Sequence, residues 1–169
     1  SDIDGEAINN YSGWSVSMNF DGDRVAIGAT GNDGAGTDAG HVRVYEYSNS
    51  SWTQLGSDID GEAAEDDSGR SVSLNSAGDR VAIGAPYNDG AGTDAGNVRV
   101  YEYSNSSWTQ MGSDIDGEAA EDESGKSVSL NSTGDRVAIG APFNDGTFGS
   151  GGHVRVYEYS NSSWAQVGS

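Results

Sequence analysis

The apolar residues of this chain lie in short alternating runs, which predict β-strands separated by polar turns. Residues 71–75 alternate polar and apolar side chains, a period of two that is typical of a half-buried strand, and in residues 80–85 Val81, Ile83 and Ala85 share one face. A glycine-containing turn at residues 77–79 joins the two runs. This arrangement predicts a β-hairpin.

Two further strands are predicted after this hairpin. Pro86 ends the second strand because proline cannot donate a ladder hydrogen bond, and the glycine-rich residues 88–96 form a loop. Residues 97–103 carry bulky side chains on both faces, which indicates a strand packed on two sides, and residues 108–111 form the fourth strand. The acidic residues 57–69, with two glycines, predict a long loop before the first strand.

The whole pattern occurs three times with a step of 56 residues. The stretch Gly-Asp-Arg-Val-Ala-Ile-Gly-Ala begins at Gly22, Gly78 and Gly134, and the stretch Ser-Asp-Ile-Asp-Gly-Glu-Ala shares its period. A repeat of this kind is typical of solenoids, propellers and arrays, whose core is built unit against unit. The chain therefore divides into three units, residues 1–56, 57–112 and 113–169. Ser169, at the end of the third unit, is the first residue of a further copy of the repeat.

Four short antiparallel strands in each unit predict an all-β fold, a β-propeller with three four-stranded blades per chain. The 26 glycines and many other small residues suit blades that converge on a narrow axis. The recurring tryptophans and tyrosines are expected to fill the wider outer part of each blade.

Three blades do not close a propeller, because closed rings contain about 4 to 8 blades. We therefore expect the ring to be completed by homo-oligomerisation. A homodimer gives six blades, and a homotrimer with nine blades is the alternative. Because each unit is expected to contain every strand of its blade, closure is expected to need no strand shared between chains.

The Gly-Ala-Pro sequences of the second and third units carry a resemblance to a known family. Gly84-Ala85-Pro86 and Gly140-Ala141-Pro142 each follow Val-Ala-Ile, and a Ser-Gly pair precedes the first strand of every unit. These residues resemble the FG-GAP repeat, the unit of the integrin α-subunit N-terminal propeller and of many bacterial and algal surface proteins. The resemblance covers the whole chain and implies a propeller and, for a natural chain, an extracellular or cell-surface location.

In that family calcium commonly binds a carboxylate-rich loop between the first two strands of a blade. The corresponding residues of this chain, 19–23, 75–79 and 131–135, form short loops with few acids. The resemblance therefore implies no calcium ligands at these positions.

The charge of the chain excludes several classes of partner. Lys and Arg total 8 against 27 Asp and Glu, a formal charge of −19, whereas nucleic acids and anionic membrane surfaces are bound by basic patches. No apolar run approaches the ~18 residues of a membrane span, so no membrane insertion is expected. The absence of cysteine excludes disulfides and thiolate metal or redox sites.

The best candidate metal ligands are alternating acids at the start of each unit. Ca²⁺ takes about 6 to 8 oxygen ligands, and spaced carboxylates beside a glycine are suited to surround it. The alternative is that these acids only cap turns through nearby backbone amides. The candidate calcium ligands are Asp2, Asp4, Glu6, Asp58, Asp60, Glu62, Asp114, Asp116 and Glu118.

The basic and histidine residues are predicted to be structural. Six of the eight basic residues recur with the repeat, beside an aspartate or two residues from a tyrosine, which predicts ion pairs or stacking. His41, Asn97 and His153 share one repeat position, and no spaced acid accompanies the histidines in the sequence. They are predicted to be polar strand starts rather than catalytic bases.

No nucleophile, base and orienting residue stand out from the repeats, so the chain is not expected to be an enzyme. Two functions remain open. One is a non-enzymatic structural, self-assembling propeller module, either a fragment of a natural surface protein or an engineered repeat protein. The other is a calcium-dependent or lectin-like propeller that binds a ligand or mediates adhesion.

Overall fold

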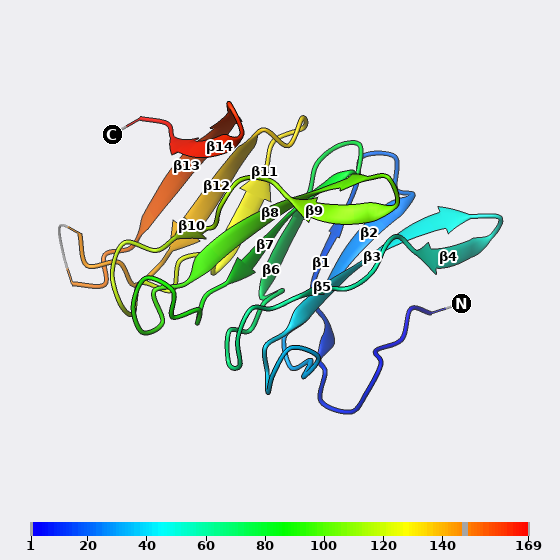
Figure 1. The fold of residues 1–169 in the computed structure, drawn as a ribbon, viewed down its shortest axis with the longest axis horizontal. Coiled ribbons are helices and arrows are strands. Elements are labelled where there is room, and N and C mark those ends of the chain that lie inside the picture. The colour runs from blue at the N-terminus through cyan, green and yellow to red at the C-terminus, as the bar shows by residue number, and fades with distance from the viewer. Residues whose placement is uncertain (1, 147–148, 169) are drawn as a thin grey trace.

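The structure of this chain is a computed structural model that describes residues 2–146 and 149–168. It consists of three antiparallel β-sheets that follow one another along the chain and stand side by side (Figure 1). The described residues form no helix, and so none that could cross a membrane. The predicted all-β fold of three antiparallel sheets is confirmed.

The three sheets share one construction. In the first, four strands pair in chain order and a short fifth strand pairs with the third: β1 (Ser12–Met18), β2 (Arg24–Ala29), β3 (His41–Ser48), β4 (Ser51–Gln54) and β5 (Ile59–Asp60). The second repeats this order with β6 (Ser71–Leu74), β7 (Arg80–Ala85), β8 (Asn97–Ser104), β9 (Ser107–Gln110) and β10 (Ile115–Asp116). The third contains β11 (Ser127–Leu130), β12 (Arg136–Ala141), β13 (His153–Ser160) and β14 (Ser163–Gln166). The four strands predicted for the second unit match β6 to β9 within one residue at each end.

The short strands β5 and β10 correct the prediction for the start of each unit. In place of a loop, Ile59 pairs with Val42 and Asp60 with His41 of the preceding unit, and β10 pairs with β8 in the same way. β4 pairs only with residues 45–48, so the first half of β3 has free backbone groups that β5 satisfies. The expectation that each unit contains every strand of its blade is therefore wrong.

The hydrophobic core lies between the sheets. Val42 and Val44 of β3 are buried against Val72 and Leu74 of β6 in the next sheet. A second core between the second and third sheets contains Val98 and Val100 of β8 with Val137 and Ile139 of β12, and Val128 and Leu130 of β11 are partly buried against it. Since β6 contacts both β1 and β11, the first strands of the three blades lie next to one another. The predicted packing of unit against unit is confirmed.

Neighbouring blades also touch through their backbones, at the glycine of the Gly-Ala-Pro sequence. A β-carbon at Gly84 would lie 2.0 Å from the carbonyl oxygen of Gly125 in the next unit. Gly125 has a φ of +89°, in the left-handed region that favours glycine, and its carbonyl accepts a hydrogen bond of 2.7 Å from Ser71 Oγ. The motif therefore marks a place where two blades meet with no room for a side chain.

We expect Gly84→Ala to lower the free energy of unfolding by about 1–3 kcal/mol, the usual cost of overpacking, because the added methyl displaces the neighbouring blade. Urea unfolding at low protein concentration measures this loss. Gly140→Ala is the matched control, since Gly140 faces Ser127 of its own blade but, within the described residues, no atom of another unit. Equal losses in the two variants would contradict the importance of the contact between blades.

Candidate metal centre and open blade faces

Three buried arginines hold the start of each unit against its own blade. Arg99 donates a hydrogen bond of 2.9 Å to the backbone oxygen of Asp60, and its guanidinium lies 5.7 Å from the centre of the Tyr101 ring. The predicted stacking of arginine on tyrosine is thereby confirmed. The other two arginines repeat both contacts: Arg43 with Asp4 and Tyr45, and Arg155 with Asp116 and Tyr157.

In the first blade, three side chains from separate segments converge. His41 begins β3, Glu6 precedes β1, and Asp58 lies just before β5. The Nδ1 atom of His41 lies 3.9 Å from Glu6 Oε2 and 3.7 Å from Asp58 Oδ2. The three ligand atoms all lie within 4.8 Å of one another. We call Glu6, His41 and Asp58 the His41 cluster.

Other side chains orient the two carboxylates of the His41 cluster. Arg43 Nη1 lies 3.3 Å from Glu6 Oε1, and Gln54 Nε2 donates a hydrogen bond of 2.6 Å to Asp58 Oδ1. Each carboxylate therefore gives one oxygen to a structural partner and has its other oxygen on the side of His41. The side chains of Glu6 and Asp58 are 43% and 33% exposed, so the cluster opens to solvent through its carboxylates.

His41 itself is buried, with 1% of its surface exposed. Neither ring nitrogen has a hydrogen-bond partner among the described residues. Burial lowers the pKa of this imidazole, and the opposing effect of the Asp58 carboxylate is smaller. The imidazole is therefore held in its neutral form, which has a lone pair available for a metal ion.

The second unit has asparagine in place of histidine, and hydrogen bonds close its cluster. Asn97 Nδ2 donates a hydrogen bond of 3.1 Å to Glu62 Oε2. Gln110 orients Asp114 through a hydrogen bond of 2.6 Å, as its counterpart does in the first unit. The Asn97 amide thus gives the Glu62 carboxylate a hydrogen-bond donor that the histidine of the first unit does not give Glu6.

The third unit contains the counterparts of two of the three residues of the His41 cluster, the histidine and the glutamate. His153 Nδ1 lies 3.6 Å from Glu118 Oε2, and the histidine side chain is 26% exposed. The counterpart of Asp58 would belong to a unit after the third. Within the described part of the chain, this third cluster is therefore incomplete.

The structure brings together only part of the predicted calcium-binding set. Glu6 and Asp58 join His41, and elsewhere among residues 2–146 and 149–168 no three acidic or histidine side chains place their ligand atoms so close. Calcium binding by the others stays a prediction: Asp2, Asp4, Asp60, Glu62, Asp114, Asp116 and Glu118.

The prediction that the histidines are polar strand starts is confirmed, because His41 and His153 are the first residues of β3 and β13, but the sequence did not show the acidic neighbours of His41. Its two acidic neighbours come from different units, Glu6 from its own and Asp58 from the next. The recurrence of these positions with the repeat is visible in the sequence. Only the pairing of β5 with β3, however, shows that they meet.

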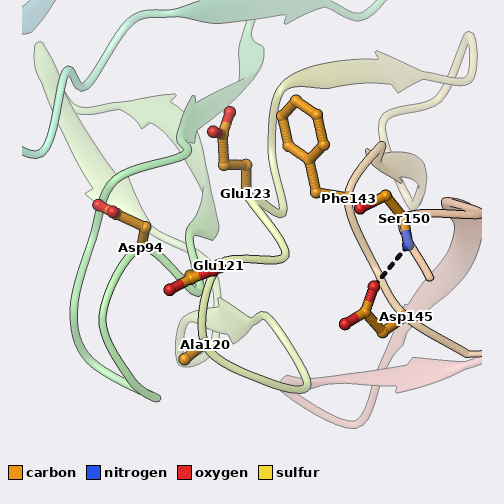
Figure 2. Close-up of a pocket in the computed structure, with 7 residues that line it drawn as sticks. All are labelled: Asp94, Ala120, Glu121, Glu123, Phe143, Asp145 and Ser150. Atoms are coloured by element: carbon orange, nitrogen blue, oxygen red, sulfur yellow. Dashed lines mark hydrogen bonds between the residues drawn. The ribbon is translucent and has the colours of Figure 1, made fainter.

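A separate acidic pocket lies between loops of the second and third units (Figure 2). Its carboxylates do not converge on one point. Asp145 accepts a hydrogen bond from the backbone nitrogen of Ser150, and Glu123, which points in another direction in Figure 2, pairs with Lys126. This pocket therefore has no ligand set comparable with the His41 cluster.

Both ends of the row of blades expose apolar residues that are buried elsewhere. Val154 of β13 is 68% exposed, whereas Val42 and Val98, at the same repeat position, are 0% exposed. At the other end Val16 of β1 is 65% exposed, against 8% for its counterpart Val72. We call these surfaces the leading face (Val16 and Met18) and the trailing face (Val154 and Val156).

No family model matches this chain, and no curated protein matches it in sequence. Solved structures match it in fold. A candidate 6-phosphogluconolactonase of Bacteroides uniformis ATCC 8492 aligns with a TM-score of 0.60 and 12% identity over 91% of this chain. Hydrazine synthase of Kuenenia stuttgartiensis aligns with a TM-score of 0.56 and 8% identity over 97%. A candidate 6-phosphogluconolactonase of Bacteroides fragilis NCTC 9343 aligns with a TM-score of 0.59 and 10% identity over 90% of this chain.

This chain spans only 39%, 37% and 36% of the length of these three proteins, respectively. At such identities the likeness shows the fold alone, an all-β, propeller-like arrangement. The resemblance to the FG-GAP repeat stays a prediction.

We expect Arg99→Met to lower the free energy of unfolding by about 1–3 kcal/mol, because it removes the hydrogen bond to the Asp60 carbonyl and the cation beside Oε1 of Glu62. Urea unfolding provides the measurement. Arg136→Met is the control, because its side chain is 54% exposed and its pair with Glu158 is of the surface kind that contributes little. A larger loss in the control would show that the buried arginine does not anchor the start of the unit.

Proposed function

We propose that this chain is a non-enzymatic, self-assembling propeller module whose partner is a second copy of itself. The observation that carries the proposal is the exposure of the trailing face. Val154 is 68% exposed there, whereas Val42 and Val98, at the same repeat position, are 0% exposed. Burial of apolar surface contributes about 25 cal/mol per Å², and uncovered apolar strand faces mark sites of protein association.

A second copy suits this face because the chain already contains the same contact twice. The trailing side of the first blade packs on the leading side of the second, and the second packs on the third in the same way. The leading face of another copy offers Val16 and Met18 where β6 offers Val72 and Leu74. Such a head-to-tail contact is heterologous and forms a ring when its rotation closes.

The edge of β13 also favours a second copy. β5 pairs with the first two residues of β3 on the edge away from β2, but among the described residues β12 is the only strand that pairs with His153 and Val154 of β13, and the opposite edge has no partner there. Residues 3–4 have the same sequence as β5, and Arg43 anchors Asp4 as Arg99 anchors Asp60. The start of one copy is therefore positioned to add a strand to the blade of another.

The pairing of the basic residues supports a structural role. All eight Lys and Arg side chains lie in ion pairs with carboxylates of this chain. Because these cations already pair with carboxylates of the chain, none is left free to bind an anionic substrate. The two-copy ring has six blades, within the usual range of about 4 to 8, and three copies with nine blades are the alternative.

We expect a particle of twice the 17.4 kDa chain mass at micromolar concentration, measured by light scattering at physiological salt, which screens the repulsion between chains of charge −19. Val154→Glu should shift the chain to the monomer, because it places a carboxylate in the contact. Thr109→Glu should leave the mass unchanged, since Thr109 is exposed although its blade has a neighbour on each side. A stable wild-type monomer would contradict the proposal.

A further inference from the structure

We propose that Glu6, His41 and Asp58 form a binding site for a divalent transition-metal ion of the zinc class. The site lies wholly within one chain and does not depend on the proposed assembly. It consists of one imidazole nitrogen and two carboxylate oxygens, all within 4.8 Å of one another.

The distances in the cluster suit a bridging cation better than hydrogen bonds. His41 Nδ1 lies 3.9 Å and 3.7 Å from the two carboxylate oxygens, beyond the roughly 3.2 Å limit of an ordinary N–H···O bond. Ligands that bind zinc tetrahedrally at about 2.0–2.1 Å lie roughly 3.3–3.4 Å apart. The imidazole nitrogen is therefore within a few tenths of an ångström of the separation that a shared zinc ion requires from each oxygen, and rotamer changes of the partly exposed carboxylates, whose oxygens lie within 4.8 Å of each other, would complete the approach.

The carboxylates are supported as metal ligands usually are. Arg43 lies against the far oxygen of Glu6, and Gln54 donates to the far oxygen of Asp58. Outer-shell partners of this kind fix the orientation of metal ligands. The arginine offsets part of the negative charge, so the expected affinity is that of an accessory site rather than of a structural zinc centre.

The buried histidine is the independent observation that points to a ligand. Both ring nitrogens of His41 are buried without a hydrogen-bond partner among the described residues, although a buried polar group is normally satisfied. A metal ion on Nδ1 would satisfy the nitrogen that faces the carboxylates.

The ligand set also selects the kind of ion. Imidazole suits zinc, copper, nickel and iron, whereas Ca²⁺ takes only oxygen ligands and about 6 to 8 of them. Glu6 and Asp58 are partly exposed, which gives water access to complete the coordination. The cluster is thus distinct in its chemistry from a calcium loop.

The second unit supplies a natural comparison. There Asn97 donates directly to Glu62, so the position needs no cation. His41→Asn therefore gives the first unit a side chain that this fold already accepts at the same place. Conversely, Asn97→His supplies the missing imidazole beside Glu62 and Asp114.

To test the site, zinc binding is measured by equilibrium dialysis and elemental analysis of the chelator-treated chain carrying His153→Asn, which removes the half-cluster of the third unit. We expect one zinc ion per chain, affinity at least about tenfold weaker after the additional His41→Asn, and one more ion after the additional Asn97→His. Circular dichroism checks that the variants are folded. Unchanged binding in the folded His41→Asn variant, or equal binding of Ca²⁺, would overturn the assignment.

The third unit extends this inference, and the extension rests on the proposed function. Glu118 and His153 lack an aspartate, and Asp2 of a second copy on the trailing face would take the place that Asp58 has in the first unit. Gln166, the counterpart of Gln54, is exposed on β14 and would orient it.

Wild-type chain in its assembled form should then bind two zinc ions per chain, and Asp2→Asn should reduce this to one. The possible failures are distinguishable by measuring mass and zinc together. A monomer with one zinc overturns the assembly but not the His41 site, and a dimer with one zinc overturns only the shared site. A dimer without zinc overturns the metal proposal and leaves the assembly standing.

Discussion

The fold of this chain depends on the close approach of each blade's backbone to the second strand of the blade before it. A methyl group at Gly84 would meet the Gly125 carbonyl at 2.0 Å, and Gly28 stands in the same relation to Gly69, at 2.1 Å. This approach brings the valines of β3 and β8 onto the neighbouring blade and excludes water between them. A single sheet of four short strands has little core of its own, so the seams between blades hold most of the buried apolar surface.

Because the seams carry the stability, a sequence unit and a blade are not the same object. β5 belongs to the second unit by sequence but completes the edge of the first blade by hydrogen bonding. Arg99 then ties the same segment to the second blade through the Asp60 carbonyl. Each start of a unit therefore joins two blades, which explains why the acidic residues that surround it lie close to side chains of both.

Much of this arrangement is predictable from the sequence because the main strands are long enough to show alternation. Residues 71–75 and 97–103 correspond to β6 and β8 with their ends moved by one residue. β5 could not be predicted, since a strand of two residues has no visible period and Ile59 lies between acids typical of loops. The His41 cluster could not be predicted for a related reason: only the pairing of β5 with β3 brings Asp58 to His41.

The three units also show that the chemistry of a seam can change while its packing does not. One repeat position holds His41, Asn97 and His153, whereas the residue after it is valine in every unit. The Asn97 amide donates a hydrogen bond to Glu62. The imidazole of His41 lies 3.9 Å from Glu6, too far for a hydrogen bond between them. The strand pairing uses only backbone atoms at this position, so the side chain is free to vary without loss of the fold. That freedom lets one residue decide whether the seam holds a hydrogen bond or a cation.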